Sequence, residues 1–263
     1  MWFAWGMGPA ARAPRTIVFV AIGAAGGILS GVFGVGGGIV LVPLLVTVAG
    51  FDQRRAAATS LLAIVPTAIA GSITYILHGQ IDWIAAAGMT VGAVAGSIMG
   101  GRLLVRIPLA LLRWLFIALL VVVAIRVAFV VPERGAPLEF SIPVLLAYLA
   151  IGLVMGLAAG LFGIGGGAIA VPALVGIMGI SDLIAKGTSL LVMAPTSLAG
   201  TITHARNGYV NWRAGAIVGV SATIAAIGGA LLAFAIPPRL SSVLFAILLL
   251  AMAVQLAVRA IRR

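Results

Sequence analysis

The chain contains one glycine-rich segment twice, and this duplication constrains its fold more than any other feature. The first copy, GVFGVGGGIVLVPLL, covers residues 31–45, and the second, GLFGIGGGAIAVPAL, covers residues 160–174; 9 of the 15 positions are identical. The offset of 129 residues continues without a gap through the shared motifs Thr-Ser-Leu-Leu, Pro-Thr and Gly-x-x-x-Trp. Such a repeat indicates a duplicated unit, here residues 1–131 and 141–263, joined by a polar connecting loop at residues 132–140.

Composition places both units in a membrane. The sequence is 63% hydrophobic and 8% charged, with a mean hydropathy of +1.29, which is far from the composition of a soluble domain. Apolar windows of 18 or more residues recur along the chain and predict an all-α polytopic membrane protein of about 8–10 transmembrane segments. A transmembrane β-barrel would require alternating segments of about 10 residues, and the sequence contains none.

Charge and residue types argue against several functions. The 16 basic residues give a net charge of +11 but lie almost entirely at the ends of apolar segments, so we expect a lipid bilayer and no nucleic acid as partner. Because cysteine is absent, disulfides and thiolate metal sites are excluded. With two well-separated histidines, we expect no metal centre and no cofactor. No nucleophile–base pair stands out within the membrane, so we expect no enzymatic activity.

The first apolar region, residues 16–50, is too long for one membrane crossing. A helix rises about 1.5 Å per residue, so this region would reach about 52 Å against a hydrocarbon core of about 30 Å. The GVGGG run in its middle is a poor helix former. We therefore predict a helix to Phe33, a break over residues 34–38 inside the membrane, and a short arm to Gly50. The second half should repeat this plan with a helix over 141–162, a break over 163–167 and an arm to about 179.

Six further helices are predicted, three in each half. Together with the broken stretch, which contributes two segments, each half then has five helical segments, or arms. Their expected ranges are 57–77, 83–104, 109–131, 186–204, 213–236 and 239–258. This segmentation gathers most arginines on the side of both termini, which the positive-inside rule makes cytoplasmic. An odd number of arms inverts the second half relative to the first. Inverted repeats with broken helices are typical of secondary transporters, whose sites lie near the membrane midplane.

The two glycine runs are the first candidates for a substrate site. Without side chains, several backbone N–H groups can face one small oxyanion, and a helix that starts just after them adds its positive end. The candidate residues are Gly36, Gly37, Gly38, Gly165, Gly166 and Gly167. The alternative is close helix packing, for which small residues are used in membranes. If the runs bind substrate, Gly37→Val or Gly166→Val should abolish transport and leave membrane insertion intact.

Two further repeated motifs accompany the glycine runs. Hydroxyl pairs stand near the starts of two predicted helices, and either cap those helices or donate to the substrate; they are Thr59, Ser60, Thr188 and Ser189. Pro66 and Pro195 interrupt mid-membrane helices, and each frees the carbonyl four residues earlier. Each proline is either a structural kink or a hinge beside the site.

Ionisable residues are scarce in the predicted helices. All carboxylates fall in predicted loops, which argues against a buried carboxylate relay and against cation binding; they are Asp52, Asp82, Glu133, Glu139 and Asp182. His78 and His204 stand near predicted helix ends and are either proton-coupling sites or interfacial side chains. Lys186 either attracts an anion or, as we favour, marks the membrane interface.

With these residues in view, the chain resembles the sulfite exporter TauE/SafE family, also called the 4-toluene sulfonate uptake permeases. The resemblance covers nearly the whole chain and rests on GVFGVGGG…VP and GLFGIGGG…VP, on the motifs Ala-Thr-Ser-Leu and Gly-Thr-Ser-Leu, and on Gly79-x-Ile81-Asp82-Trp83 with Gly208-x-Val210-Asn211-Trp212. It implies a carrier in the bacterial inner membrane for sulfite, sulfonates, thiosulfate or related organosulfur anions. Two departures concern coupling: Asn211 replaces the usual acid, and Tyr75 stands where the second half has His204.

The expected function is secondary transport of a small anionic substrate by alternating access between the inverted repeats. A passive anion channel would share a donor-lined interior but would show neither counterflow nor saturation. A non-transporting membrane scaffold would use the glycines for packing alone. The unit could also pair as a homodimer.

Overall fold

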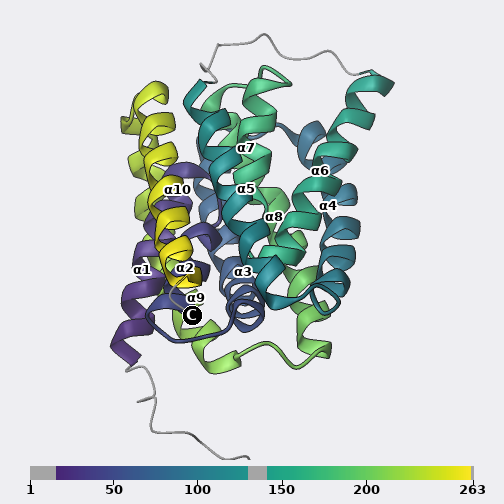
Figure 1. Ribbon diagram of the computed structural model, residues 1–263. Coiled ribbons are helices and arrows are strands. Elements are labelled where there is room, and N and C mark those ends of the chain that lie inside the picture. Colours follow the sequence, from purple (N-terminus) through teal and green to yellow (C-terminus); the bar gives the residue numbers. More distant parts are fainter. Residues whose placement is uncertain (1–15, 130–140, 262–263) are drawn as a thin grey trace, which may run out of the picture.

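The computed structural model describes residues 16–129 and 141–261, which form ten α-helices (Figure 1). The connecting loop expected at 132–140, with Glu133 and Glu139, lies outside the described residues. The helices of the first half are α1 (Thr16–Phe33), α2 (Gly38–Thr47), α3 (Gln53–Leu77), α4 (Trp83–Leu104) and α5 (Leu109–Phe129). Those of the second half are α6 (Ile142–Phe162), α7 (Gly167–Gly176), α8 (Asp182–Arg206), α9 (Trp212–Ala235) and α10 (Pro238–Ile261).

Both predicted breaks are confirmed. Helix α1 ends at Phe33 and α6 at Phe162, and the short helices α2 and α7 have 10 residues each. Helix α3 begins at Gln53 rather than at residue 57, because the Asp52 side chain accepts a hydrogen bond from the Arg55 N–H at 2.9 Å and caps the helix. Helix α8 also begins four residues early. Its first residue is Asp182, so the expectation that this carboxylate lies in a loop is wrong.

The long helices are membrane helices. In the described part of the chain, eight helices are long and apolar enough to cross a membrane. Helices α2 and α7 are too short, because 10 residues of helix cover only about 15 Å. Trp83 and Trp212, the first residues of α4 and α9, are 61% and 60% exposed, as expected for aromatic side chains at a membrane interface. The protein is therefore a multi-pass membrane protein.

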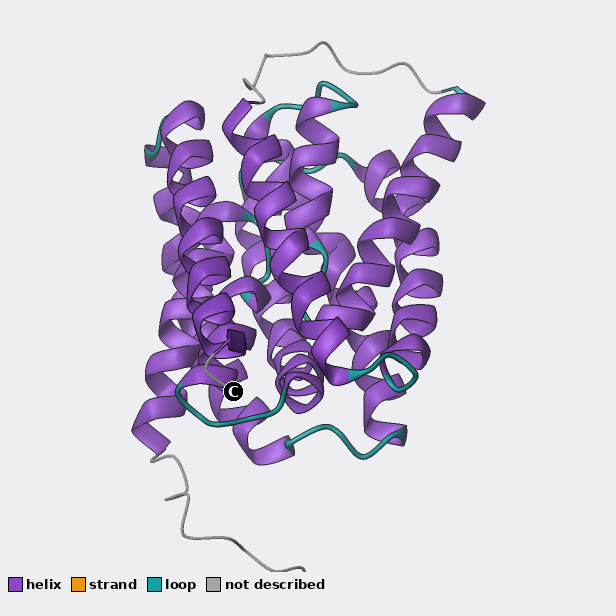
Figure 2. Ribbon diagram, viewed as in Figure 1, coloured by secondary structure: helices purple, strands orange, loops and turns teal. Residues whose placement is uncertain are grey.

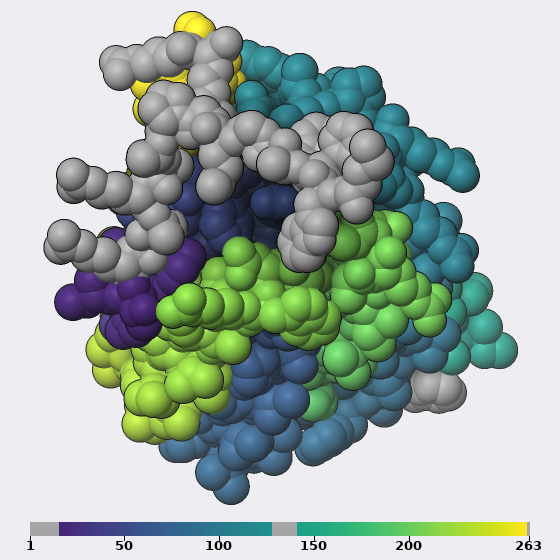
Figure 3. Space-filling model, turned by 90° about the horizontal axis from the view of Figure 1, so that it is seen from below, coloured from purple at the N-terminus to yellow at the C-terminus, as the bar shows by residue number. Residues whose placement is uncertain are grey.

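The helices run so that α1 begins and α10 ends at the same end of the bundle, whereas α5 ends and α6 begins at the opposite end (Figure 1). At the first end, the Arg54 side chain donates to the Ile107 carbonyl at 2.7 Å and joins α3 to the connection between α4 and α5. Figure 3 shows this end directly, with the bright green connection from α8 to α9 crossing its middle. The loops at mid-height of the bundle belong to the two breaks, as Figure 2 shows.

Glycines at four-residue spacing join the two halves. Helix α1 packs along α9 through Gly23, Gly27 and Gly31, and α6 packs along α4 through the equivalent Gly152, Gly156 and Gly160. A Cβ atom at any of these positions would meet backbone atoms of the partner helix. Close contact of this kind stabilises helix pairs in membranes, where no hydrophobic effect drives them together. The halves are therefore interlocked by packing.

This packing predicts that Gly156→Leu destabilises the protein, because a Cβ there would meet the Ala93 carbonyl oxygen. Overpacking costs about 1–3 kcal/mol where side chains can move, and backbone cannot move aside so easily. We expect a clear loss of thermal stability in detergent. Gly228→Leu is the matched control, because a Cβ at Gly228 of α9 has no neighbour within 4 Å. Equal melting temperatures for the two variants would contradict the packing account.

Candidate functional site

The two glycine breaks, which are 129 residues apart in sequence, touch each other inside the bundle. A Cβ atom on Gly38 would lie 2.5 Å from Ile164 Cα, and one on Gly167 would lie 2.5 Å from Val35 Cα. Side chains at these glycines would therefore push the breaks apart. The sequence predicted both breaks near the midplane but contained no signal that they are in direct contact.

Each break ends in a helix N-terminus that is rich in hydrogen-bond donors. Gly37 and Gly166 are the N-caps of α2 and α7, and both have a left-handed backbone, with φ of 71° and 92°. The first N–H groups bonded to these caps are those of Val40 and Ile169. Among the described residues, the N–H groups of Gly36–Gly38 and Gly165–Gly167 have no acceptor. Two positive helix ends with unused donors thus lie next to each other.

Ile64 of α3 and Met193 of α8 fill the space that the glycines leave. They are equivalent positions of the two repeats, and both are fully buried. The Met193 methyl group lies where a Cβ of Gly36 or of Gly165 would be, and Ile64 Cγ2 lies 3.2 Å from both of these positions. The centre between the breaks is therefore closed by two apolar side chains. In sequence, neither residue differs from its apolar neighbours.

The predicted serines lie at this centre. The Ser60 hydroxyl lies within hydrogen-bond distance of two acceptors for its single proton, the Ala57 carbonyl at 3.0 Å and the Gly163 carbonyl at the start of the second break. Ser189 Oγ donates to Met193 Sδ at 3.8 Å. The structure thus brings both serines together with the glycine breaks.

The predicted threonines instead hold connections of the opposite half. Thr188 Oγ1 accepts a hydrogen bond from the Asp82 N–H at 2.9 Å, and Thr59 Oγ1 accepts one from the Asn211 N–H at 3.1 Å. The alternative that the threonines cap their own helices is wrong, because α3 and α8 begin earlier in the chain. Each threonine ties the connection before α4 or α9 to the other repeat.

The residue before the tryptophan of each Gly-x-x-x-Trp motif acts as a helix cap. The Asp82 side chain accepts from the Ala85 N–H at 2.9 Å, and the Asn211 side chain accepts from the Ala214 N–H at 3.0 Å. Capping needs a side-chain oxygen but no charge, and asparagine serves as well as aspartate. The departure of Asn211 from the family pattern therefore preserves its structural role.

We predict that Thr188→Val destabilises the protein because it removes the acceptor of the Asp82 N–H. A fully buried donor without an acceptor costs about 1–3 kcal/mol, and because this hydrogen bond is only partly buried we expect a loss toward the lower end of that range, which thermal unfolding in detergent can measure. Thr90→Val is the control, because Thr90 Oγ1 bonds only to the Ala86 carbonyl of its own helix, at 2.7 Å. An unchanged melting temperature combined with weaker anion binding would instead show that Thr188 contacts the substrate.

Pro66 and Pro195 lie within α3 and α8, as predicted. They follow Ile64 and Met193 by two residues, so any flexing at the prolines would move the side chains that close the centre. In each helix the next threonine hydroxyl donates to a carbonyl of the preceding turn, at 2.8 Å from Thr67 and at 2.7 Å from Thr196. The interrupted turns are therefore partly held by side chains.

The histidines have different surroundings. His204 is fully buried, and its Nε2 atom lies 2.9 Å from the Gly160 carbonyl, so the interfacial interpretation of this residue is wrong. Tyr75, at the equivalent position, donates to the Gly31 carbonyl at 2.9 Å. Each of these two side chains thus contacts the carbonyl of the first glycine in the glycine-rich segment of its own half, so tyrosine and histidine occupy the same structural role in the two repeats. His78 is exposed at the end of α3 and stacks on Phe234 with ring centroids 4.4 Å apart.

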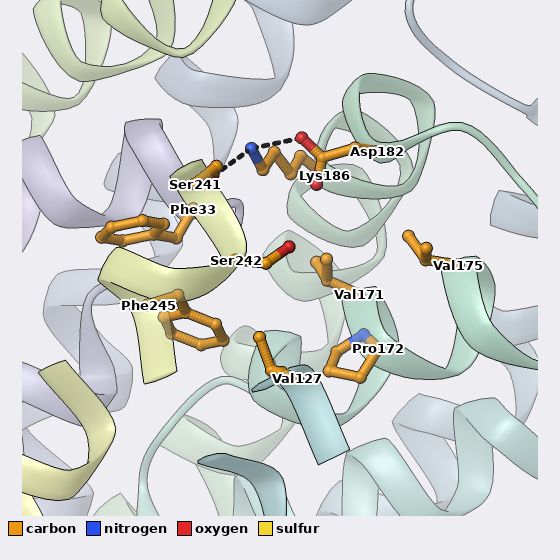
Figure 4. Close-up of a pocket in the computed structure, with 10 residues that line it drawn as sticks. All are labelled: Phe33, Val127, Val171, Pro172, Val175, Asp182, Lys186, Ser241, Ser242 and Phe245. Carbon is orange, nitrogen blue, oxygen red and sulfur yellow. Dashed lines mark hydrogen bonds and ion pairs between the residues drawn. The ribbon is translucent and has the colours of Figure 1, made fainter. Parts of the chain in front are cut away.

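Lys186 is buried beside the first break, so the expectation that it marks the membrane interface is wrong. Its Nζ atom donates to Asp182 Oδ2 at 2.6 Å and to Ser241 Oγ at 2.8 Å (Figure 4). The Lys186 and Asp182 side chains are only 2% and 9% exposed. A Cβ on Gly34 would lie 2.6 Å from Lys186 Cα. The sequence signal for this ion pair was the four-residue spacing of Asp182 and Lys186, because side chains four residues apart are neighbours on the same face of a helix.

Comparison with known proteins agrees with this architecture. The sequence profile of the sulfite exporter TauE/SafE family matches residues 1–127 and 148–263. The chain is 27% identical over 220 residues to YunE, a probable membrane transporter protein of Bacillus subtilis (strain 168), covering 74% of this chain and 80% of that protein. It is 31% identical over 201 residues to a probable membrane transporter protein of Xylella fastidiosa (strain Temecula1 / ATCC 700964), covering 74% and 77%.

The matched residues include both glycine breaks, all ten described helices in whole or part, and the Lys186 pair. The duplicated membrane architecture and the sequence comparison therefore lead to the same conclusion. The chain belongs to the sulfite exporter TauE/SafE family and is a multi-pass membrane transporter.

Proposed function

We propose that this protein is a secondary transporter of small sulfur-containing oxyanions such as sulfite, sulfonates or thiosulfate. The observation that carries the proposal is the contact between the two glycine breaks, where the N-termini of α2 and α7 lie next to each other. Backbone N–H groups at helix N-termini bind oxyanions without a charged side chain. The description of the family as sulfite exporters supports the substrate class.

We further propose that the halves are inverted repeats that work by alternating access. The opposite starting ends of α1 and α6 support this relation (Figure 1), and so do the equivalent hydrogen bonds of Thr59 and Thr188 to the connections of the opposite half. A site between inverted repeats is equally placed for both sides of the membrane. Rocking of one repeat against the other would then expose the breaks to each side in turn.

The arginine-bearing end of the bundle supports an orientation with both termini in the cytoplasm of a bacterial inner membrane. Arg54, Arg55, Arg102, Arg106 and Arg206 lie in or beside the connections at the end where α1 begins and α10 ends. Positive residues in short connections face the cytoplasm. Fusion of a reporter enzyme to the C-terminus would test this orientation.

In the proposed cycle, the closed centre must open before an anion can bind. Ile64 and Met193 fill the space between the breaks, so they have to withdraw from Gly36 and Gly165. Pro66 and Pro195, two residues further along the same helices, are the points where α3 and α8 can flex. The donors of both breaks would then converge on the oxyanion.

The test is uptake of labelled sulfite into proteoliposomes, with unlabelled sulfonates, thiosulfate, sulfate and chloride as competitors. We expect saturable uptake that some sulfur oxyanions inhibit and chloride does not. Fast uptake that does not saturate would indicate a passive channel. No uptake above that of empty liposomes would indicate another cargo or a scaffold, and would overturn the proposal.

A further inference from the structure

A small cavity next to the first break contains the buried charge pair of the described helices. The cavity has a volume of about 30 Å³ and lies between α5, α7, α8 and α10, with Lys186, Asp182, Ser241 and Ser242 on its polar side (Figure 4). Phe33, the residue before the first break, also lines it. A polar cavity of this size has room for water. The cavity thus lies between the first turn of α8 and Phe33, the last residue before the first break.

The ammonium group of Lys186 has room for one more partner. An ammonium has three donors, and among the described residues Lys186 uses two of them, for Asp182 and Ser241. A buried ion pair is costly to desolvate and is weak support for stability. Ionisable residues inside a membrane protein usually mark the path of a substrate or ion. These considerations point to a role for the pair beyond packing.

The other half has an equivalent cavity, which differs in charge. It is smaller, about 10 Å³, and the repeat offset places its Gln53 at the position of Asp182 and its Arg113 at that of Ser242. Arg259 also lines it. Gln53 is 1% exposed, and its amide nitrogen has no acceptor among the described residues. The lining of this cavity thus includes two arginines and an unused amide donor but no carboxylate, whereas the other cavity holds a carboxylate bonded to its cation.

We propose that Lys186 is an anion-binding residue at the mouth opposite the termini, and that the Asp182 carboxylate occupies it in the closed state as an internal competitor. The proposal rests on the proposed transport function and extends the substrate route to this mouth. An incoming oxyanion of the sulfite type takes the place of the carboxylate on the ammonium. The cation is then paired at every stage, which avoids the cost of an unpaired buried charge.

The position of Asp182 allows this exchange. It is the first residue of α8, next to the connection that starts this helix at the end of the bundle. A carboxylate displaced from Lys186 can turn toward water from there. It remains close to the N-terminus of α8, where the helix dipole favours negative charge. In the equivalent cavity no such exchange is needed, because Gln53 is neutral.

The test measures stabilisation of the purified full-length protein by sulfite in thermal unfolding, and in parallel the half-saturation concentration of sulfite uptake. We expect Asp182→Asn to lower the sulfite concentration needed for half-maximal stabilisation, roughly tenfold, because the competitor is gone. Lys186→Gln should raise it by a similar factor. The double variant Lys186→Gln/Asp182→Asn has no unpaired buried charge, so it should fold and bind sulfite as weakly as Lys186→Gln.

A charge-reversed variant separates binding from a merely structural ion pair. Asp182→Lys/Lys186→Asp retains a pair but moves the cation to the first turn of α8, and we expect it to lose the sulfite response. A wild-type response in this variant or in the neutral double variant would overturn the proposal. If sulfite stabilises the variants as expected but no uptake is measured, the anion site is supported and the transport function is contradicted. Failure of the anion site and failure of the transport function can therefore be distinguished.

Discussion

Replacing Gly37 or Gly166 by valine is expected to lower the initial rate of sulfite uptake by roughly 100-fold or more, which corresponds to about 2.7 kcal/mol. Both glycines have a left-handed backbone, with φ of 71° and 92°, which costs other residues about 1–2 kcal/mol. A Cβ would also lie 2.5 Å from the Gly26 carbonyl oxygen at Gly37, and 2.7 Å from that of Met155 at Gly166. The short helices would shift, and their N-terminal donors would no longer face a common point.

Gly50→Val and Gly179→Val provide matched controls. These glycines are equivalent positions of the two repeats, with φ of 74° and 65°, and a Cβ on either has no neighbour within 4 Å. They carry the same backbone strain without the steric conflict. We expect both controls to transport sulfite and all four variants to insert into the membrane, as quantified by extraction and size-exclusion chromatography. Uptake by Gly37→Val as fast as by Gly50→Val would contradict an oxyanion site at the break.

Replacing Met193 by phenylalanine is expected to abolish uptake almost completely. The Met193 methyl group already lies against Gly36 and Gly165, and its Sδ atom would be 2.9 Å from a Cβ on Gly167. A larger, stiffer ring cannot withdraw from this space as methionine can, because methionine has three flexible bonds. The oxyanion and the ring would compete for one volume. Saturable sulfite uptake, measured in proteoliposomes, is the readout.

Met193→Leu is the matched control because it conserves volume, a change that usually costs less than about 1.5 kcal/mol. We expect this variant to keep most of the uptake. Ile64→Phe, at the equivalent position of the first repeat, should block uptake as Met193→Phe does. If Met193→Phe folds and transports like the wild type, the space between the breaks is not on the substrate route.

Much of the helical layout could be predicted because glycine, proline and the duplication mark it in the sequence. The predicted range of α4, residues 83–104, agrees with the structure, and the ends of α1 and α6 at Phe33 and Phe162 were also correct. Helix-breaking GxGGG runs and Gly-x-x-x-Trp connections leave little freedom in these places. Where a cap decides the boundary, as at Asp52, the prediction was late by one turn.

The composition of the centre could not be predicted, because it depends on which helices pack together. Ile64 and Met193 are apolar residues among many others in the sequence. Only the contact between the two breaks shows that they fill the space beside Gly36 and Gly165. Asp182 was assigned to a loop because the helix was predicted to begin only at residue 186. The four-residue spacing to Lys186 was visible in the sequence, but nothing in a single sequence shows that Ser241 of α10 binds the same ammonium group. The sequence also does not show that the two residues of each Thr-Ser pair have different roles. In the structure the serine lies at the centre between the breaks, and the threonine binds a connection between helices.

Counterflow tests the central claim, alternating access at a site between the two breaks, most directly. Proteoliposomes are loaded with unlabelled sulfite and diluted into a trace of labelled sulfite. The account predicts that label accumulates transiently above its equilibrium level in wild-type liposomes, and that Gly37→Val abolishes this overshoot while Gly50→Val preserves it. Entry of label that rises to equilibrium without an overshoot, or an overshoot that survives in Gly37→Val, would contradict the account.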